Sequence, residues 1–397
     1  MSRVGRVVVT GRGARRARRG HPWIFADDVL GVDDGLRAGD VCRVEDRSGA
    51  FCCWASFSPA SRIVLRRLSR AEGPPGPETW LARFRQAVDR RRDYPVDDPP
   101  CLRYVHAEAD GFPGLVADRY GDLLVLQPTT AWADRVARDH AAAFAEASGT
   151  RAVLGRMDAP ARRFEGLPAG VQPLHGEVPR EVRVVEAGVP RAVDPWSGHK
   201  TGLYLDQQEN HRRASAWLVG GGETEVLDLF AAEGGFAVPL ARAGARVVAV
   251  DRSPELLERG RRAAEAAGVG DRIEWVPGNA FDLLAAWQRE GRPFDAIVLD
   301  PPPFARSRNA REGAARGYRD LHRRAFRLLR PGGRVLSFTC SFAVDAAAFE
   351  GAAREGIEEA GASARVVGRP GPAADHPELL EVPETRYLRG LLLERAG

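Results

Sequence analysis

One stretch, residues 226–251, constrains the fold of this 397-residue chain more than any other. It begins with the apolar run Val226–Phe230, passes through Gly234 and Gly235 into a stretch of helical character, and ends with a second apolar run that stops at Asp251. An apolar run, a glycine turn, a helix and a second apolar run form one strand–helix–strand unit of a parallel sheet. The chain is therefore expected to contain an α/β domain with a ligand site at the end of the first strand.

The acidic residues around this turn indicate the class of ligand. A dinucleotide site needs spaced glycines and helix N–H groups that are free to bind a pyrophosphate, whereas Gly234 and Gly235 are adjacent and Glu233 places a carboxylate in the loop. S-adenosylmethionine carries a sulfonium and an ammonium group, and acidic residues favour both. Asp228 adds a second carboxylate, and Asp251 can accept hydrogen bonds from ribose hydroxyls. We therefore predict an S-adenosylmethionine pocket, with a structural turn that binds no ligand as the alternative.

Two later apolar runs are expected to end at the same edge of the sheet. Ile273–Val276 leads to Asn279 and Asp282, which are the candidates for reading an adenine amino group. Phe294–Asp300 ends in an acid followed by three prolines, which stiffen the exit of the strand and hold the carboxylate where open α/β sheets bind ligands. The expected cofactor residues are therefore Gln207, Asp228, Phe230, Gly234, Gly235, Asp251, Asn279, Asp282 and Asp300.

An aromatic residue and a thiol complete this edge. Phe304 follows the prolines, so Asp300 can hydrogen-bond the edge of a nucleobase while the ring packs on its face. The run Arg334–Phe338 leads to Cys340, which lies between two hydroxyl residues at the end of a strand. A stiff strand exit and a buried apolar cysteine are the structural alternatives.

A thiol at this edge distinguishes two methylation chemistries. Carbon 5 of a pyrimidine is a poor nucleophile, and a thiolate that adds to carbon 6 makes it reactive toward a sulfonium methyl group. Methylation of a nucleobase nitrogen needs no thiol. The hypothesis is that Cys340 is the covalent nucleophile and Asp300 orients the base, provided that the thiol ionises near neutral pH.

The charge pattern indicates a polyanionic partner. The formal net charge is +4, and arginines cluster over residues 12–19 and again late in the chain, at Arg306, Arg308, Arg311 and Arg316. Such clusters suit nucleic acid, although solvated surface arginines explain each of them equally well. Lys200 is the single lysine, which indicates either a need for a compact ammonium group at that position or chance. The expected RNA contacts are Arg15, Arg16, Arg18, Arg19, Lys200, Phe304, Arg316 and Tyr318.

Several classes of protein and site are not expected. No apolar run has the length of a membrane span, and the arginine-rich start lacks the apolar segment of a signal peptide, so a cytoplasmic location is expected. The five cysteines are an odd number without a Cys-x-x-Cys pair. Neither a disulfide framework nor a metal site is therefore expected.

Strand-like runs, linkers and helical stretches divide the chain into three expected domains. Residues 1–72 form a β-rich module, in which the arginine stretch 12–19 is expected to be a loop. The linker Gly-Pro-Pro-Gly-Pro at 73–77 precedes an α/β accessory domain over residues 78–190. Residues 191–397 hold the α/β unit described above.

Three smaller segments carry expectations of their own. Val182–Asp194 is expected to form a hairpin, and Gly313–Asp320 a basic loop. Residues 199–207 form a polar, glycine-flanked stretch that can fold over the cofactor cleft or simply connect two domains. Its candidate polar contacts are Thr201, Tyr204, Asp206 and Gln207.

Taken in order, these motifs resemble the bacterial large-subunit ribosomal RNA cytosine-C5 methyltransferases that carry an N-terminal PUA domain. Single motifs are weak, but the ordered set is specific and covers nearly the whole chain. It comprises residues 18–25, 58–61, 108–115, 199–207, 234–236, 300–302, 317–320, 339–341, 375–377 and 387–390.

The resemblance implies a class I (Rossmann-like) methyltransferase domain preceded by a small β-barrel PUA domain and an α/β accessory domain. It also implies Cys340 as nucleophile, S-adenosylmethionine as cofactor, and 23S ribosomal RNA or a large-subunit assembly intermediate as partner. Gln208 and Pro303 depart from the family pattern, and Pro303 excludes a second cysteine that could help to release product. A homodimer, methylation of a base nitrogen with a structural Cys340, and a cofactor-holding RNA-binding module without turnover stay open.

Overall fold

The computed structural model describes residues 5–304, 311–341 and 343–396. Its contacts divide the chain into two compact units, and each is described by itself. Unit 1 comprises Met1–Val184, Ala192–Leu205 and Asp375–Thr385, and unit 2 comprises Val185–Arg191, Asp206–Ala374 and Arg386–Gly397. Segments 192–205 and 375–385, which were expected within a methyltransferase domain over 191–397, therefore belong to unit 1. None of the helices in the described part of the chain combines the length and the apolar character needed to cross a membrane.

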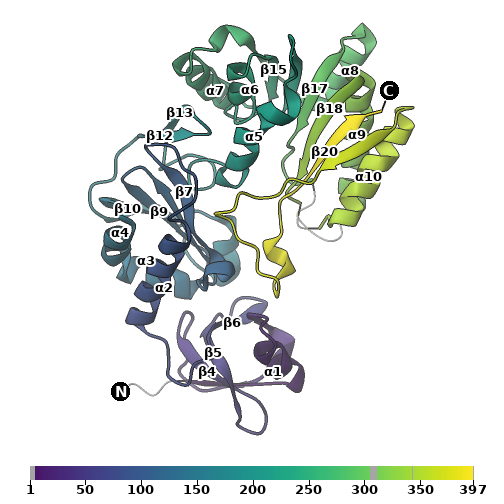
Figure 1. The fold of residues 1–397 in the computed structure, drawn as a ribbon. Coiled ribbons are helices and arrows are strands. Elements are labelled where there is room, and N and C mark those ends of the chain that lie inside the picture. The colour runs from purple at the N-terminus through teal and green to yellow at the C-terminus, as the bar shows by residue number, and fades with distance from the viewer. Residues whose placement is uncertain (1–4, 305–310, 342, 397) are drawn as a thin grey trace. The chain divides into compact units, whose positions relative to one another are not determined.

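Unit 1 begins with a six-stranded sheet in the order β2-β6-β5-β4-β1-β3 (Figure 1). Strand β5 shows why it forms a core, because six of its seven residues are buried. Buried cysteines and valines from β1, β4 and β5 pack there against Ala14 and Ala17. The strands are β1 (Arg6–Val9), β2 (Trp23–Phe25), β3 (Val29–Val32), β4 (Val41–Glu45), β5 (Phe51–Phe57) and β6 (Ile63–Ser69).

The arginine stretch near the start is a helix, α1 (Gly11–Arg18), and the prediction of a loop there is wrong. The Thr10 hydroxyl caps the helix by accepting a hydrogen bond from the N–H of Gly13 at 3.1 Å. Ala14 and Ala17 are buried against the sheet, so the arginines between them lie on the outer face. Two small apolar residues at helical spacing are a weak pattern among so many charges, which explains the error.

The second sheet of unit 1 has five strands in the order β11-β10-β9-β8-β7. Helices α2, α3 and α4 pack on it through a core that includes Trp80, Phe84, Trp132 and Phe144. Its elements are α2 (Pro77–Arg90), β7 (Cys101–His106), β8 (Leu115–Tyr120), β9 (Leu123–Pro128), α3 (Ala131–Asp139), α4 (Ala141–Ser148), β10 (Ala152–Arg156) and β11 (Val171–His175). The expected hairpin follows as β12 (Val182–Glu186) and β13 (Val189–Val193).

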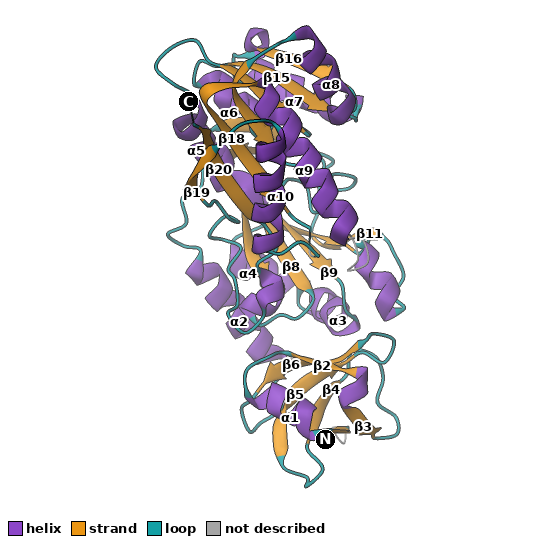
Figure 2. Ribbon diagram, turned by 90° about the vertical axis from the view of Figure 1, so that its right-hand side faces the viewer, coloured by secondary structure: helices purple, strands orange, loops and turns teal. Residues whose placement is uncertain are grey.

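Unit 2 contains a seven-stranded sheet in the order β16-β15-β14-β17-β18-β20-β19 (Figure 2). Strands β14 to β18 are parallel, and β20 and β19 are antiparallel additions at one side. This confirms the predicted α/β sheet built on the strand–helix–strand unit. The strands are β14 (Glu225–Leu229), β15 (Arg246–Asp251), β16 (Ile273–Pro277), β17 (Phe294–Leu299), β18 (Leu329–Thr339), β19 (Ala364–Gly368) and β20 (Arg389–Arg395).

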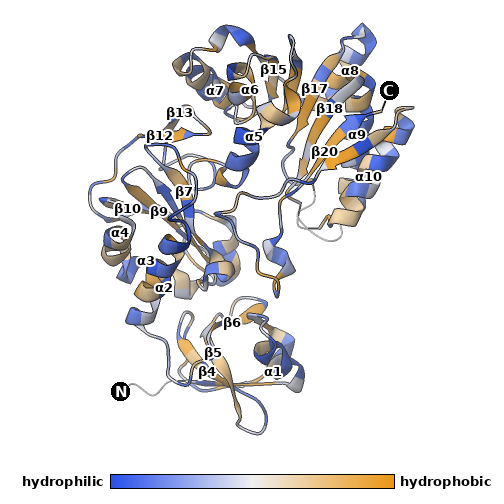
Figure 3. Ribbon diagram, viewed as in Figure 1, coloured by the Kyte–Doolittle hydropathy of each residue, from blue (hydrophilic) through white to orange (hydrophobic). Residues whose placement is uncertain are grey.

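Alternate residues of these strands point to opposite faces of the sheet, and their side chains pack into two separate hydrophobic cores. In β14, Leu227 and Leu229 belong to the core beneath α8, α9 and α10, whereas Val226 belongs to the core beneath α5, α6 and α7. This alternation follows from the period of two along a strand. Most of the length of β17 and β20 is accordingly coloured as hydrophobic in Figure 3. The helices are α5 (Gln208–Leu218), α6 (Ala237–Arg242), α7 (Pro254–Ala266), α8 (Ala280–Glu290), α9 (Arg311–Leu328) and α10 (Ala346–Glu359).

Residues 313–320, which were predicted to be a basic loop, lie within the helix α9. Ala314, Tyr318, Leu321 and Ala325 are all buried in the same core. They recur at spacings of three and four residues, so one face of the helix is apolar while the arginines occupy the other. Charged residues and Gly317 lie between these apolar positions, so the helical spacing was not recognised in the sequence.

Candidate active site at the carboxyl edge of the sheet

The expected site residues gather at the carboxyl ends of the five parallel strands of unit 2. Phe230 follows β14, Asp251 ends β15, Asn279 lies just beyond β16, Asp300 follows β17 and Cys340 follows β18. Strand β14 lies between β15 and β17, so the strand order reverses beside it. Open α/β sheets bind their ligands at such a reversal point.

The loop after β14 has a strained backbone that its neighbours hold in place. Phe230 and Ala232 have φ values of 66° and 47°, in the left-handed region that non-glycine residues rarely adopt. The carboxylate of Asp251 accepts hydrogen bonds from the N–H of Ala232 at 3.0 Å and from the N–H of Ser253 at 2.9 Å. Strain of this kind persists only where the surroundings determine the conformation, and it concentrates at functional sites. Asp251 thus shapes the loop in addition to its expected role toward ribose.

The paired glycines of this loop are required by packing against protein side chains. A Cβ atom at Gly235 would lie 2.5 Å from the ring of His211, and one at Gly234 would lie 2.6 Å from the ring of Trp275. Gly234 also has a φ of 74°. Sequence reasoning assigned both glycines to a close approach by the ligand, and the structure supplies a protein-internal reason for them.

Asp228 supplies a test of whether the pocket suits a cation. It is 1% exposed, and neither carboxylate oxygen makes a hydrogen bond of normal geometry with a described residue, although the N–H of Ala237 lies near enough to stabilise its charge. Burial, followed by repulsion from Asp300, raises the pKa of Asp228 well above its usual range. A buried carboxylate without a protein cation beside it is costly. The sulfonium or ammonium group of S-adenosylmethionine would stabilise its charge, so these residues fit that cofactor.

Glu233, the other acid of the loop, has a partner of its own. Its carboxylate lies 3.1 Å from the guanidinium of Arg259 on α7. Part of the negative charge expected at the loop is therefore neutralised within the protein. The acidic character of the edge rests mainly on Asp228, Asp251 and Asp300.

Asp300 is oriented by a short chain of amides. The side-chain amide of Gln207 donates to the Asp300 carboxylate at 3.1 Å, and its oxygen accepts from Asn210 at 2.6 Å. Asn210 also donates to the carbonyl of Gly371 at 2.9 Å. Gln207 is 3% exposed and Asn210 is 3% exposed, so the chain is shielded from water. Gln207 therefore lies beside Asp300, and its role toward the cofactor stays a prediction.

Asn279 caps the helix α8, and Asp282 is exposed. The Asn279 side-chain oxygen accepts from the N–H of Phe281 at 3.0 Å and caps α8. Asp282 lies one turn into that helix. Both lie after β16 at the expected edge.

Cys340 lies between Thr339 and Ser341, whose hydroxyls form a hydrogen-bond network with Tyr318. Thr339 donates to the Tyr318 hydroxyl at 2.7 Å, and the Tyr318 and Ser341 hydroxyls lie 3.1 Å apart. Ser341 also accepts from the N–H of Phe304 at 3.1 Å, which joins the end of β18 to the loop after β17. Cys340 itself is half-buried, and its Sγ lies 3.9 Å from the carbonyl oxygen of Pro301. The thiol and Asp300 are therefore held at one edge by a shared network.

The burial of Tyr318 corrects its expected role as an RNA contact. The side chain is 0% exposed and belongs to the core of unit 2, so its ring cannot stack on a base. Burial raises the pKa of Tyr318 to about 12, so the hydroxyl stays neutral and can serve the network. The Phe304 ring packs on Tyr318 at 4.8 Å and is half-buried, while Arg316 is exposed. Arg306 and Arg308 lie outside the described residues.

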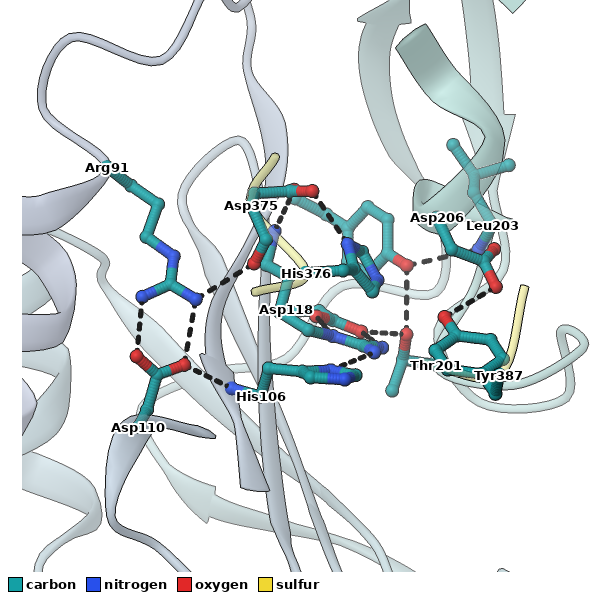
Figure 4. Close-up of polar contacts among 12 residues, drawn as sticks. Arg91, His106, Asp110, Asp118, Thr201, Leu203, Asp206, Asp375, His376 and Tyr387 are labelled. Atoms are coloured by element: carbon teal, nitrogen blue, oxygen red, sulfur yellow. Dashed lines mark hydrogen bonds and ion pairs between the residues drawn. The ribbon is translucent and has the colours of Figure 1, made fainter. Parts of the chain in front are cut away.

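The polar stretch 199–207 is anchored within each unit separately (Figure 4). In unit 1, Thr201 donates to Asp118 at 2.5 Å and lies 3.0 Å from the Tyr120 hydroxyl. In unit 2, Asp206 accepts from the Tyr387 hydroxyl at 2.8 Å. Thr201 and Asp206 are thus occupied by protein partners.

Lys200 and Tyr204 lie on the surface of unit 1. The Lys200 ammonium lies 4.7 Å from the centre of the Tyr204 ring, and Lys200 has a φ of 53°. The exposed cation and the exposed ring therefore form one small surface feature, on a strained backbone.

The arginines of α1 divide into two groups. Arg18 pairs with Asp46 at 2.6 Å, and Arg16 lies 3.7 Å from Asp28 with its guanidinium over the Phe25 ring. Arg15 and Arg19 are exposed and have no acidic partner within 4.0 Å among the described residues. These two arginines are therefore the most available to phosphate.

Sequence reasoning missed residues that support the site from behind. Arg191 donates to the carbonyls of Glu233 and Gly234, and His211 packs against Gly235. Arg191 and Glu233 are 42 positions apart, and no spacing rule connects them. The one available signal was the predicted hairpin over Val182–Asp194, which contains Arg191.

Family models match most of the chain. A model of S-adenosylmethionine-dependent methyltransferases matches residues 133–391, and a model of PUA-like domains matches residues 7–70. The match to the first model covers more than half of the chain, so the family is shown. Its members use S-adenosylmethionine, which agrees with the cofactor predicted from the acidic loop.

Individual relatives and solved structures agree with these models. Ribosomal RNA large subunit methyltransferase I of Vibrio cholerae is 34% identical over 379 residues, covering 94% of this chain and 95% of that protein. The protein of the same name from Klebsiella pneumoniae (strain 342) is 32% identical over 389 residues, covering 97% and 96%.

The similar solved structures include a SAM-dependent methyltransferase from Streptococcus mutans, with a TM-score of 0.82 and 18% identity over 98% of this chain and 99% of that one. Another is a methyltransferase complexed with SAH, with a TM-score of 0.83, 19% identity and the same coverage. At these identities the structures show a shared fold alone. By its family models and its relatives, the chain belongs to the S-adenosylmethionine-dependent methyltransferases, in the family of ribosomal RNA large subunit methyltransferase I proteins, and carries a PUA-like domain at residues 7–70.

Proposed function

We propose that this protein methylates carbon 5 of a cytosine in large-subunit ribosomal RNA through a covalent bond to Cys340. The observation that carries the proposal is the position of the thiol. Cys340 follows a parallel strand at the edge that holds Asp228, Asp251 and Asp300, and its Sγ faces the carbonyl of Pro301, the residue after Asp300. Methylation of a base nitrogen gives no reason for a half-buried thiol there.

The thiol supplies the reactivity that carbon 5 lacks. The Cys340 thiolate adds to carbon 6, a bond forms between Sγ and carbon 6, and the electrons of the 5,6 double bond become available at carbon 5. Bound S-adenosylmethionine supplies an electrophilic methyl group. Carbon 5 takes this methyl group, S-adenosylhomocysteine leaves, and carbon 5 then gives up its proton to a base to which no residue is assigned. The returning electrons restore the double bond and release Cys340 as a thiolate.

Asp300 orients the base during these steps. Its carboxyl group would hold or protonate N3 of cytosine, and the side-chain amide of Gln207 donates to it at 3.1 Å. The neighbouring Asp228 carries a raised pKa partly because of Asp300, so the two acids lie close enough to influence one another.

The RNA contacts are proposed on the exposed cations of unit 1. Arg15, Arg19 and Lys200 are exposed, and arginine and lysine suit phosphate contacts. The relatives named ribosomal RNA large subunit methyltransferase I and the PUA-like domain support a large-subunit rRNA substrate. We place the reaction in the cytoplasm, with residues 1–72, 78–190 and 191–397 as the PUA, accessory and methyltransferase domains.

Nucleoside analysis of the product tests the proposal. Large-subunit rRNA lacking the modification is incubated with labelled S-adenosylmethionine and the wild-type protein, then digested and separated. We expect the label in 5-methylcytidine, and none with Cys340→Ala, although that variant should still bind S-adenosylhomocysteine. Label in an N-methylated nucleoside, or full turnover by Cys340→Ala, would overturn the proposal.

A further inference from the structure

The tip of the hairpin formed by β12 and β13 lies against the back of the loop after β14. Both the tip, Val185–Arg191, and the loop belong to unit 2. Arg191 is 5% exposed, and its guanidinium donates to the carbonyl of Glu233 at 2.7 Å and to that of Gly234 at 3.2 Å. The Gly234 carbonyl also accepts from the N–H of Val238 at 3.1 Å, in the first turn of α6. Arg191 therefore fixes the two peptide groups at which the loop turns into the helix.

A second contact from the same buried cluster fixes the next residue of the loop. The His211 ring lies against Gly235, where an added Cβ atom would be 2.5 Å away, and packs edge-on against Phe236 at 4.5 Å. Glu186 at the hairpin tip links both supports, since it lies 2.7 Å from Nδ1 of His211 and 3.4 Å from Arg191. The loop is thus held from Glu233 to Phe236 by one hairpin-based cluster.

The charges of this cluster match the requirements of a site for a cationic ligand. A buried guanidinium alone would repel a sulfonium, but Glu186 is 4% exposed and lies beside it. Burial alone would raise the pKa of Glu186, but His211 and Arg191 lower it below the usual value, so the carboxylate is ionised. Arg191 can therefore provide a two-pronged donor to the loop while Glu186 offsets its charge.

We propose that Arg191, held by Glu186, is a positioning residue for S-adenosylmethionine, which keeps the loop at Glu233–Phe236 in its binding conformation. The loop contains two non-glycine residues at positive φ, Phe230 and Ala232, so its conformation depends on external support. Asp251 supplies that support at Ala232, and Arg191 supplies it at the next two residues, Glu233 and Gly234. This role does not depend on the proposed carbon-5 chemistry.

The test measures cofactor binding directly, by calorimetric titration of the full-length protein with S-adenosylhomocysteine, beside the KM values for S-adenosylmethionine and RNA. Arg191→Gln removes the forked donor, and Arg191→Lys keeps the charge beside Glu186 but cannot reach both carbonyls. The matched control is Arg242→Gln, because Arg242 donates to the Gly188 carbonyl of the same hairpin but not to the loop.

We expect Arg191→Gln and Arg191→Lys to weaken S-adenosylhomocysteine binding by about tenfold or more and to raise the KM for S-adenosylmethionine, with the KM for RNA unchanged. Arg242→Gln should bind like the wild type. If Arg191→Gln does not fold, Arg191→Lys decides the outcome. A lower melting temperature with unchanged S-adenosylhomocysteine affinity would overturn the proposal, as would an equal effect of Arg242→Gln.

Glu186→Gln separates positioning from charge. It keeps the volume of the side chain but leaves the Arg191 charge without its carboxylate, so it should also weaken S-adenosylhomocysteine binding. Normal affinity in Glu186→Gln would contradict the role given to the pair. Because binding needs neither cytosine nor Cys340, these outcomes are independent of whether the carbon-5 proposal holds.

Discussion

Among single residues, Asp228 is the one whose burial at the expected cofactor site most clearly lowers the stability of the ligand-free protein. In the ligand-free protein its raised pKa means that the native state keeps a proton that the unfolded chain releases. The free energy of unfolding should therefore fall as the pH rises from about 3.9 toward the higher native pKa. Asp228→Asn should remove this dependence and stabilise the ligand-free protein by about 1 to 3 kcal/mol at pH 8.

The same substitution should weaken the binding of S-adenosylmethionine, because the amide cannot offset a sulfonium charge. Denaturant unfolding at several pH values and a binding titration measure both effects. A less stable Asp228→Asn protein, or one with unchanged affinity, would show that the carboxylate is structural.

Tyr318 provides a second residue-scale prediction. Tyr318→Phe leaves the hydroxyls of Thr339 and Ser341 without a shared partner, so we expect a loss of about 1 to 2 kcal/mol in unfolding free energy. Because those residues flank Cys340, kcat should also fall while the cofactor affinity stays normal. Tyr104→Phe is the control, since the Tyr104 hydroxyl accepts from Arg119 in unit 1. If the two variants had the same kcat, Tyr318 would not help to position the nucleophile Cys340.

At the scale of elements, the helix α1 should carry part of the affinity for RNA. Replacing the unpaired Arg15 and Arg19 by Gln should weaken binding and reduce the slope of log affinity against log salt by about 1.4 to 1.8, as two lost phosphate contacts require. Replacing Arg12 and Arg18 is the comparison, because Asp28 and Asp46 already hold them at 2.7 and 2.6 Å. A salt slope that is the same in both double variants would place the RNA elsewhere.

The elements also show what the sequence could and could not predict. The five parallel strands of unit 2 and the acids that end β15 and follow β17 were predicted correctly, because an apolar run that stops at a polar residue is a local signal. The antiparallel strands β19 and β20 were not predicted at these positions. The helix α1 and the first part of α9, residues 313–320, were taken for loops, because buried Ala14, Ala17 and Tyr318 are separated by arginines and glycines. Contacts such as Arg191 to Glu233 join distant segments, and the sequence contains no local sign of them.

For the whole molecule, we expect the two units to bind different ligands. S-adenosylhomocysteine should slow amide hydrogen exchange at residues 229–236 of unit 2 and leave residues 7–70 unchanged, because the expected cofactor residues all lie in unit 2. RNA should slow exchange in α1. Protection of residues 7–70 by S-adenosylhomocysteine alone, or no protection of unit 1 by RNA, would contradict this division.

The most direct test of the central claim is to trap the bond between Cys340 and the base. Large-subunit rRNA containing 5-fluorocytidine is incubated with S-adenosylmethionine and either the wild-type protein or Cys340→Ala, and the products are separated under denaturing conditions. Fluorine cannot leave carbon 5 as a proton does, so the account predicts a slowly migrating protein–RNA band with the wild type and none with Cys340→Ala. Methyl transfer to unsubstituted rRNA without any such band from the fluorinated RNA would contradict it.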